Sequence, residues 1–260
     1  TQPVSNAPAD HGANILAALR LVCFLGLTVA SIPVHWFFMW RRPHDPYRVP
    51  RAFYSVLLQC IGIRLRVHGV LTDNKPTLYV CNHTSYLDIP VLAALLPASF
   101  VAKSEVAGWA LFGFMAKLQK TVFIKREIMR TADQADVMRD RLASGRSLIL
   151  FPEGTSSDGQ SVLPFKSSYF AVAESVGREI ALTIQPVSMC CTELEGLPLT
   201  RALRPIFAWF GDMTLAGHLW NVFKIGSITV DVIFHPAFQA QDFPNRKALS
   251  AACHEVVARG

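Results

Sequence analysis

The sequence contains few charged side chains. Asp, Glu, Lys and Arg make up 17% of the 260 residues, whereas hydrophobic residues make up 51%. A typical soluble domain has about 25% charged residues. This composition argues against a disordered chain and is compatible with membrane contact. The formal net charge of +6 suits a nucleic acid and an anionic lipid surface about equally well.

The patterns of a metal site, a disulfide framework and a serine nucleophile are absent from the sequence. None of the six cysteines belongs to a C-x-x-C pair, and none combines with histidine at zinc-ligand spacing. G-x-S-x-G does not occur. Cys23 and Cys60 lie in apolar stretches, where a free thiol behaves as a small hydrophobic group. We therefore expect a reducing compartment, no structural disulfide, no metal site and no bound cofactor.

No formal charge occurs from Leu21 to Trp40 (LVCFLGLTVASIPVHWFFMW). A segment of about 20 apolar residues can span the hydrocarbon core of a bilayer. A secretory signal peptide fits poorly, because a basic n-region and a small-residue cleavage site are missing. Pro33 and His35 disfavour a straight span, so a segment embedded in one leaflet, ending in the aromatic belt at 36–40, fits equally well.

Arginine is concentrated directly after this apolar segment. Six arginines and one acidic residue occur between Arg41 and Arg66. Basic residues after an apolar segment are typical of the cytoplasmic side, and they attract an anionic leaflet. We expect a flexible tail at 1–14, a membrane-anchoring helical pair at 15–62 and a catalytic domain at 63–260 on the cytoplasmic side. The alternative is a pair of core helices in a soluble domain.

From residue 63 onward, short apolar strands alternate with helical segments. Strands are expected at 77–81, 99–103, 121–125, 147–151, 180–189 and 227–234, and helices at 86–96, 109–118, 131–144, 166–176 and 245–259. The alternation predicts an α/β fold with a mixed, largely parallel sheet flanked by helices. Pro186 interrupts an apolar strand, which predicts a sheet edge or a bulge, because proline has no N–H to donate.

The stretch YVCNHTSYLDIP places His83 and Asp88 five residues apart after an apolar strand. On one continuous helix their side chains would lie about 140° apart. They meet only if His83 lies in the turn and Asp88 in the first helical turn. A carboxylate bonded to one imidazole nitrogen leaves the other nitrogen as a general base. A histidine satisfied within a loop and an acidic residue at a helix start produce the same spacing.

Polar groups also follow other predicted strands. FPEGTSS places Glu153, Gly154 and Thr155 in a loop, where glycine permits close approach of a ligand. An ordinary turn at a strand end is the alternative. Cations at strand ends bind phosphate or remain solvated surface charges. The cations in question are Lys103, Lys125 and Arg126.

A late aromatic stretch at 205–224 (PIFAWFGDMTLAGHLWNVFK) has two interpretations. Aromatic residues at helical spacing usually belong to the core. The same residues are also suited to a membrane-facing element or to the wall of an acyl channel.

Taken in order, NHTSYLD, VFIKR, FPEGTSS and IQPV resemble the four motif blocks of the lysophosphatidic-acid acyltransferase family, the PlsC-like (1-acyl-sn-glycerol-3-phosphate acyltransferase) enzymes of the H-x4-D type. The resemblance covers residues 55–235. It implies an enzyme of the bacterial inner (cytoplasmic) membrane. Such an enzyme transfers a fatty acyl group from acyl-CoA or acyl carrier protein (acyl-ACP) to the free hydroxyl of a lysolipid.

The resemblance also implies roles for individual residues. His83 is the general base, and Asp88 orients it. Arg126 and Lys103 hold the acceptor head group, the 153–155 loop shapes the acceptor site, and Pro186 forms part of the acyl-side wall. The implied substrate-binding residues are Asn82, Ser85, Lys103, Lys125, Arg126, Glu153, Gly154, Thr155 and Pro186.

One position departs from the family pattern. Many members carry an arginine after E-G-T, and Ser156 stands there in this sequence. A guanidinium binds phosphate with two hydrogen bonds, which a serine cannot replace. The expected acceptor is 1-acyl-sn-glycerol-3-phosphate, and a lyso-ornithine lipid is the alternative. A non-catalytic lipid-binding membrane module is the alternative from another class. Nucleic-acid binding is disfavoured, because the arginines cluster beside an apolar segment.

Overall fold

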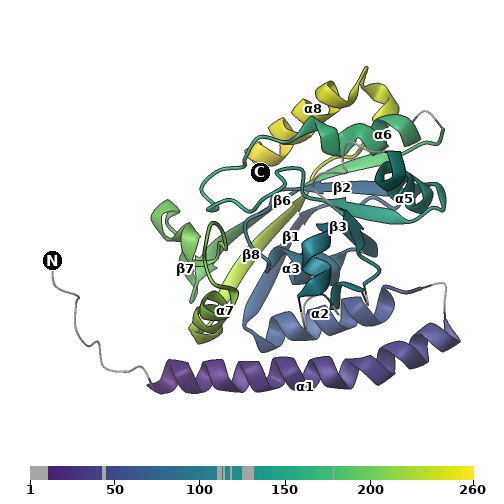
Figure 1. Cartoon of the computed structure of the whole chain (residues 1–260). Coiled ribbons are helices and arrows are strands. Elements are labelled where there is room, and N and C mark those ends of the chain that lie inside the picture. Colours follow the sequence, from purple (N-terminus) through teal and green to yellow (C-terminus); the bar gives the residue numbers. More distant parts are fainter. Residues whose placement is uncertain are drawn as a thin grey trace.

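The structure is a computed structural model that describes residues 11–42, 45–109, 113, 115–117, 119–124, 132–177 and 179–260. Within this part of the chain, strands form one twisted sheet with helices on both faces (Figure 1). The strands are β1 (Ile63–Gly69), β2 (Thr77–Cys81), β3 (Ala98–Lys103), β4 (Val122–Ile124), β5 (Ser147–Leu150), β6 (Thr183–Leu194), β7 (Leu197–Pro198), β8 (Ile228–Phe234) and β9 (Phe238–Gln239).

The α-helices surround the sheet in two layers, and short 3-10 helices join some of the elements. The α-helices are α1 (His11–Arg41), α2 (Arg48–Cys60), α3 (Asp88–Leu95), α5 (Ala132–Ala143), α6 (Ala171–Val176), α7 (Leu215–Lys224) and α8 (Arg246–Arg259). The 3-10 helices are η1 (Ser104–Gly108), η3 (Ser167–Phe170), η4 (Arg201–Ile206) and η5 (Ala240–Asp242).

The sheet has the strand order β1-β8-β6-β2-β5-β3-β4, with β7 and β9 paired to β6. Strands β6, β2, β5, β3 and β4 are parallel, and the pairing of β6 with β8 is antiparallel. The prediction of a mixed, largely parallel sheet flanked by helices is therefore confirmed. Because parallel strands end at one edge, the turn after β2 and the loop after β5 lie side by side.

Every residue of β2 is buried, because helices cover both faces of the sheet. Leu78 and Val80 belong to the core beneath α5, α6 and α8. Tyr79 and Cys81 point the other way, into the core shared with α1, α2, α3 and α7. Figure 1 shows α1, α2 and α3 on the face of the sheet opposite α5, α6 and α8. This alternation explains why TLYVC is a continuous apolar run rather than an alternating one.

The prediction that Pro186 marks a sheet edge or a bulge is wrong. Pro186 is buried in β6, where it pairs with Val80 of β2 on one side. Its carbonyl oxygen accepts the N–H of His235 at 3.1 Å on the other side, between the stretches that pair with β9 and with β8. The N and O atoms of one strand residue point to the same side of the strand. The position where Pro186 would carry an N–H therefore faces the gap between β9 and β8, and no hydrogen bond of the sheet is lost.

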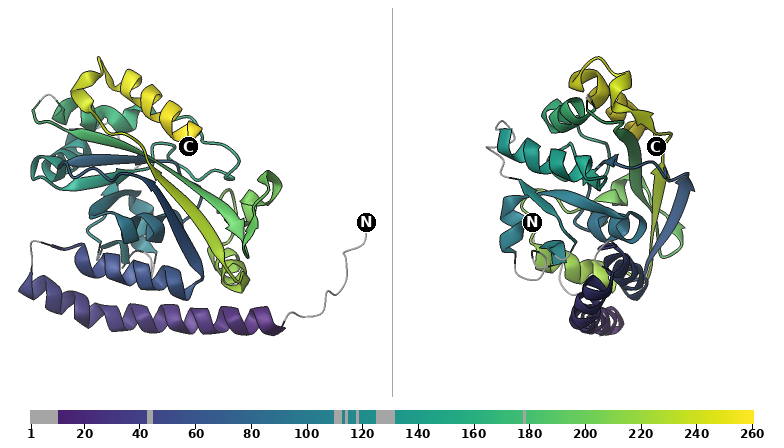
Figure 2. Two further views of the ribbon diagram at one scale, coloured as in Figure 1. Left: turned by 180° about the vertical axis from the view of Figure 1, so that it is seen from behind. Right: turned by 90° about the vertical axis from the view of Figure 1, so that its right-hand side faces the viewer.

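The N-terminal helices differ from their expected bounds. Helix α1 begins at His11, so its first four residues fall in the segment expected to be a tail, and residues 1–10 lie outside the described residues. Helix α2 ends at Cys60. Figures 1 and 2 show α1 lying lengthwise along α2 and the body rather than projecting from it. Among the described residues, α1 is the one helix long and apolar enough to cross a membrane.

Opposite faces of α1 have different surroundings. Ala17 and Phe24 are buried against the body, next to α2 and α7. The outer face is apolar and exposed, and its large side chains are Ile15, Leu19, Val22, Leu25, Val29, Val34, Trp36, Phe37 and Trp40. An exposed apolar stripe of this length is unusual for a soluble protein, and it is the kind of surface that a lipid interface covers.

One charged residue holds α1 to the body. Arg20 is 7% exposed, and its guanidinium donates to the carbonyl of Phe223 at 3.1 Å and to that of Gly226 at 2.7 Å. It also donates to the carbonyl of Ile225. These carbonyls stand at the C-terminal end of α7, where a helix has unpaired acceptors and a partial negative charge. Arg20 therefore ties α1 to the end of α7.

Candidate active site

The candidate site lies at the carboxyl ends of β2 and β5, which are adjacent and parallel. The turn at 82–87 follows β2, and the loop at 151–157 follows β5. Helix α3 begins at Asp88, and the backbone N–H of Asp88 donates to the Ser85 carbonyl at 3.1 Å. The sequence thus produces the strand–turn–helix arrangement that brings residues five positions apart into contact.

His83 and Asp88 form a hydrogen-bonded pair. His83 Nδ1 lies 2.8 Å from Asp88 Oδ2, and the Asp88 side chain is 2% exposed. The same carboxylate accepts the N–H of Thr84 at 2.7 Å and that of Ser85 at 3.0 Å, and the Thr84 hydroxyl at 3.1 Å. These donors fix the carboxylate, so the imidazole faces an acceptor at Nδ1 and carries its lone pair on Nε2.

Glu153 binds the backbone of the turn at 82–87, which we call the catalytic turn after the candidate residue His83. Its Oε1 accepts the N–H of His83 at 2.6 Å, and its Oε2 accepts the N–H of Leu163 at 2.9 Å. The His83 carbonyl in turn accepts the N–H of Ser157 at 2.9 Å. The loop after β5 therefore holds His83 at both its N–H and its C=O. The predicted site residue Glu153 points to this backbone and is 2% exposed, so it acts on the position of His83.

Burial raises the pKa of Glu153 to about 7. The hydrogen bonds from the N–H groups of His83 and Leu163 act in the opposite direction, because they stabilise the ionised form. Burial is the larger effect because the carboxyl has little contact with water.

Gly154 has a φ of +70°, which disfavours any residue with a Cβ atom. A Cβ atom there would also lie 2.8 Å from Tyr169 Oη and 3.0 Å from Lys166 Nζ. Lys166 thus places an ammonium beside the loop, and no spacing or motif in the sequence indicated it. Thr155 is exposed, as expected for a loop residue that faces open space.

The His83 ring stacks on Phe151, with 4.3 Å between ring centroids and 22° between planes. Beside this stack lies an apolar cavity of about 180 Å³, which His83 lines. Its walls come from α1, α2, α3, β3, η1 and α7 and from the segment around Trp209. The main apolar lining residues are Phe24, Tyr54, Leu57, Ile61, Tyr86, Leu87, Ile89, Pro90, Phe100, Val106, Trp109, Met115, Trp209, Leu219 and Phe223.

Part of the late aromatic stretch at 205–224 lines this apolar cavity. Trp209, Leu219 and Phe223 are both part of the packed structure and part of the cavity wall. The N-terminal helices contribute Phe24 and Tyr54 to the same wall. The N-terminal helices and His83 therefore line one apolar space.

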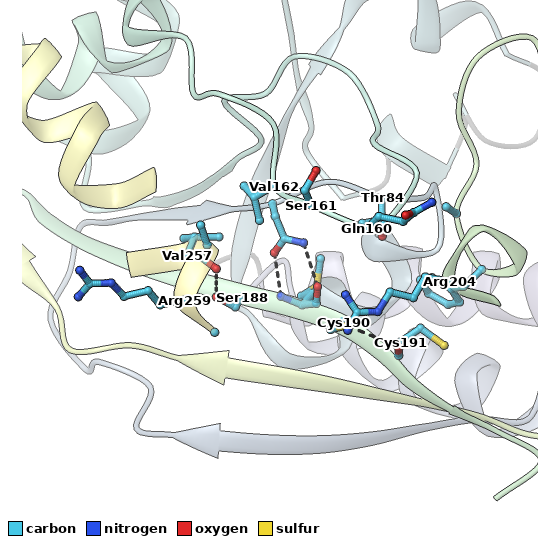
Figure 3. A pocket seen from close by; sticks show the side chains of 17 residues that line it. Thr84, Gln160, Ser161, Val162, Ser188, Cys190, Cys191, Arg204, Val257 and Arg259 are labelled. Carbon is cyan, nitrogen blue, oxygen red and sulfur yellow. Dashed lines mark hydrogen bonds between the residues drawn. The ribbon is translucent and has the colours of Figure 1, made fainter. Parts of the chain in front are cut away.

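A second, polar cavity of about 290 Å³ lies beside the catalytic turn (Figure 3). Asn82 and Thr84, the neighbours of His83 in sequence, both line it. The opposite wall is formed by the loop at 159–162, by β6 and by Arg204 of η4. The full lining is Asn82, Thr84, Gly159, Gln160, Ser161, Val162, Ser188, Met189, Cys190, Cys191, Arg204, Phe207, Ala208, Val257, Ala258, Arg259 and Gly260.

Some of the predicted binding residues make contacts within the protein, and their binding roles stay predictions. The Asn82 amide pairs with both backbone groups of Met189, at 2.9 and 2.8 Å, and so extends the contact between β2 and β6. Ser85 is fully buried, and its Oγ accepts the N–H of Leu87 at 3.3 Å. Pro186 lines neither cavity. The apolar cavity is lined mainly by helices, and Pro186 of β6 lies apart from it within the sheet.

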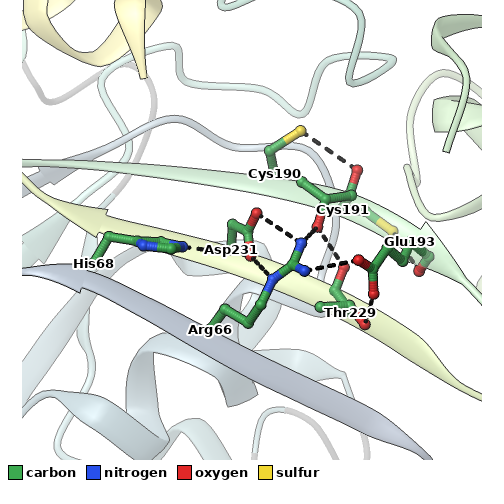
Figure 4. Close-up of polar contacts among 8 residues, drawn as sticks. Arg66, His68, Cys190, Cys191, Glu193, Thr229 and Asp231 are labelled. Carbon is green, nitrogen blue, oxygen red and sulfur yellow. Dashed lines mark hydrogen bonds and ion pairs between the residues drawn. The ribbon is translucent and has the colours of Figure 1, made fainter. Parts of the chain in front are cut away.

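Of the predicted cations, the structure describes Lys103, which lies at the same edge of the sheet. Lys103 ends β3 and pairs in register with Ile124, the last residue of β4. Lys125 and Arg126 follow Ile124 in sequence but lie outside the described residues. Arg66, one of the six arginines expected near a leaflet, is engaged in the sheet (Figure 4).

Arg66 joins β1 to two neighbouring strands. Its Nε lies 2.6 Å from Asp231 of β8, and its Nη1 lies 2.7 Å from Glu193 of β6. Figure 4 shows the guanidinium between these carboxylates. This arginine therefore stabilises the sheet and is not free to contact lipid.

Among the described residues, no group of three or more His, Cys, Asp or Glu side chains has the arrangement of a metal site. The groups that the site does present are the imidazole–carboxylate pair, the backbone amides of the loop after β5 and the Lys166 ammonium.

Comparisons with known proteins agree with this arrangement. The family model described as Acyltransferase matches residues 64–190. The lyso-ornithine lipid O-acyltransferase of Brucella abortus is 38% identical over 237 residues, which cover 89% of this chain and 88% of that protein. The 1-acyl-sn-glycerol-3-phosphate acyltransferase of Neisseria gonorrhoeae is 30% identical over 217 residues, which cover 83% of this chain and 81% of that protein.

A solved structure shares the fold. The crystal structure of the 1-acyl-sn-glycerophosphate acyltransferase PlsC from Thermotoga maritima aligns with a TM-score of 0.62 at 21% identity, covering 93% of this chain and 95% of that one. The ordered motif blocks, the matches along the chain and the shared fold agree. The chain belongs to the PlsC-like family of H-x4-D glycerolipid acyltransferases and is an acyltransferase of lysolipids.

Proposed function

We propose that this enzyme transfers a fatty acyl group to the free hydroxyl of a lyso-ornithine lipid. The observation that carries the proposal is the similarity to relatives named for this acceptor, at 38% identity over 89% of the chain for the Brucella abortus protein and 38% over 91% for that of Rhizobium meliloti. The relative named for 1-acyl-sn-glycerol-3-phosphate from Neisseria gonorrhoeae is 30% identical. This proposal replaces the acceptor expected from the motifs alone.

The residue after E-G-T supports this choice. Ser156 donates its hydroxyl to the Trp209 carbonyl at 2.5 Å, and Trp209 donates its N–H to the Thr84 carbonyl at 2.9 Å. Ser156 therefore joins two loops at the site. It contributes no positive charge for a phosphate, as an arginine in its place would. A zwitterionic head group requires less positive charge than a phosphate monoester does.

In the proposed reaction, His83 is the general base. Asp88 holds Nδ1 as a donor, so Nε2 removes the proton from the acceptor hydroxyl as its oxygen attacks the thioester carbonyl of acyl-CoA or acyl-ACP. The tetrahedral intermediate collapses by breaking the C–S bond. The proton on Nε2 passes to the departing thiolate, which yields a free thiol and the acylated lipid. No covalent acyl-enzyme is required.

The loop after β5 offers donors for the oxyanion of this intermediate. Within the described part of the chain, the backbone N–H groups of Thr155 and Ser156 donate no hydrogen bond. The N–H groups of Gly154 and Ser157 on either side are already used. Two adjacent unpaired amides beside a catalytic histidine are suited to binding a developing negative charge.

The apolar cavity is the proposed site of an acyl chain, because its walls are almost entirely hydrocarbon and it begins at His83. Helix α1 contributes to this wall with one face and exposes apolar side chains on the other. We therefore propose that the enzyme lies at the cytoplasmic face of a bacterial inner membrane, with α1 embedded in lipid. The lysolipid acceptor would enter from the membrane, and the thioester donor would enter from the water side.

Side-by-side turnover tests the acceptor. The purified enzyme in vesicles is given one acyl donor and either a lyso-ornithine lipid or 1-acyl-sn-glycerol-3-phosphate, and kcat/KM is measured for each. We expect kcat/KM to be at least about tenfold higher for the lyso-ornithine lipid, which corresponds to about 1.4 kcal/mol of transition-state preference. Equal values, or a preference for 1-acyl-sn-glycerol-3-phosphate, would contradict the proposed acceptor and leave the acyltransferase assignment intact.

A further inference from the structure

We propose that Arg204, in the polar cavity beside the catalytic turn, binds the anionic group of the acceptor head group. For an ornithine lipid this group is the carboxylate. The inference rests on the proposed function, which supplies the ligand, and it assigns a residue that belongs to none of the four motif blocks.

The position of the polar cavity suits a head group. Asn82 and Thr84 flank His83 in sequence and line the polar cavity, whereas His83 itself lines the apolar cavity. The catalytic turn thus separates an apolar space from a polar one. A lysolipid whose hydroxyl lies at His83 would match these two spaces, because it has hydrocarbon on one side of the reacting oxygen and a charged group on the other.

Arg204 is the cation in this cavity that lacks a partner. Within the described part of the chain, its guanidinium makes no hydrogen bond or ion pair, and its Nε is buried without a partner. A buried unpaired donor is costly, so such a group usually has a ligand. By contrast, Arg66 has two carboxylates, and Arg259 on the cavity rim pairs with Glu255.

The cavity lining provides no acidic side chain as a counter-ion for Arg204. Asp and Glu are absent from its lining, all of which lies among the described residues. The thiols nearest to Arg204 are those of Cys190 and Cys191 (Figure 3). Burial raises the pKa of both, and that of Cys191 to about 12, so neither supplies a thiolate at neutral pH. Because no group in the described part of the chain pairs with Arg204, we assign it an anion from outside as partner.

The surrounding loops place Arg204 within the active site. A Cβ atom on Gly159 would lie 3.6 Å from Arg204 Cβ, so the arginine stem passes beside the loop that follows E-G-T-S-S. Five residues further along, Trp209 is bonded to both Ser156 and Thr84. The segment at 204–209 is thus fixed both to the loop that carries Ser156 and to the turn that carries His83.

A paired-substrate experiment tests this assignment. Wild type, Arg204→Gln, Arg204→Lys and the control Arg201→Gln, an exposed arginine in the same 3-10 helix, are reconstituted in vesicles. Each is assayed with a lyso-ornithine lipid and with its head-group methyl ester, which lacks the negative charge. Because both lipids meet the same protein, a folding defect cancels in the ratio of their kcat/KM values.

Wild type and Arg201→Gln should favour the free carboxylate over the ester by about tenfold or more, as for a hydrogen bond to a charged group. The ratio should fall to about 1 in Arg204→Gln and to an intermediate value in Arg204→Lys, through the KM for the acceptor and with the KM for the donor unchanged. An unchanged ratio in Arg204→Gln would overturn the role of Arg204 while the proposed function stands. A wild type that does not use the lyso-ornithine lipid would overturn the proposed function itself, and the carboxylate assignment with it.

Discussion

At the scale of single residues, the site depends on two carboxylates with different tasks. Asp88 accepts hydrogen bonds from the imidazole Nδ1 of His83 and from two backbone N–H groups. It therefore fixes both the tautomer of the imidazole and the conformation of the turn. Glu153 touches only backbone, at His83 and Leu163. Asp88 thus determines which imidazole nitrogen carries the proton, and Glu153 determines the position of the His83 backbone.

The buried carboxyl of Glu153 should make the stability of the protein depend on pH. Its pKa is about 7 in the folded protein and lower in the unfolded chain, so the folded state binds more protons between these values. Stability should therefore fall as pH rises toward 7 and level off above it, by at most about 1.4 kcal/mol per pH unit. Glu153→Gln removes this titration, although it also loses one acceptor for the two N–H groups.

The check is the free energy of unfolding of both proteins in detergent at pH 5 and pH 8. The difference between wild type and Glu153→Gln should shift in favour of the variant at pH 8. A difference that is the same at both pH values would show that the carboxyl does not titrate in this range.

At this scale the sequence predicted the pair and missed the neighbours. His83 and Asp88 stand in a short motif whose strand–turn–helix context is readable. Lys166 and Arg204 reach the site through the packing of distant loops, so no local pattern indicates them. The role expected for Ser85 stays a prediction, and the structure adds that its Oγ is buried and accepts the N–H of Leu87, a contact that depends on the exact path of the turn.

At the scale of elements, α1 is packed into the enzyme body with one face and exposes an apolar stripe on the other. Phe24 of α1 and Phe223 of α7 line the same apolar cavity, and Arg20 ties the two helices together. The alternation of strands and helices was predictable from apolar runs and turn residues. The central position of β6 in the sheet was not predictable. Pro186 fits there because it lies at the gap between β8 and β9, and this gap is a property of the assembled sheet.

Loss of the Arg20 contact should loosen this arrangement. Arg20→Met leaves the carbonyls at the end of α7 without their donor, and we expect the free energy of unfolding to fall by about 2–3 kcal/mol. The exposed Arg64 on β1 is the matched control, and Arg64→Met should change stability by no more than about 0.5 kcal/mol. Denaturant titration in detergent micelles measures both. Equal, small effects of the two substitutions would contradict the proposed tie between α1 and α7.

At the scale of the whole molecule, helix α1 connects the edge of the sheet that carries His83 with the exposed apolar surface. The apolar cavity extends from His83 to walls provided by α1 and α2, and the outer face of α1 carries an exposed apolar stripe. The low charge content of the sequence anticipated a lipid-facing protein. It did not reveal that the anchoring helices also build the cavity, since this depends on how α1 packs across α2 and α7.

The most direct test of the account is acyl transfer by wild type and His83→Ala in vesicles, with a lysolipid acceptor and a thioester donor. His83→Ala should lower kcat by about 10²- to 10⁴-fold, as expected for loss of a general base, while vesicle binding in high salt and the folded state are unchanged. The control His68→Ala, an exposed histidine on β1, should retain full activity. A His83→Ala enzyme that retains near-wild-type turnover would contradict the assignment of His83 as the general base.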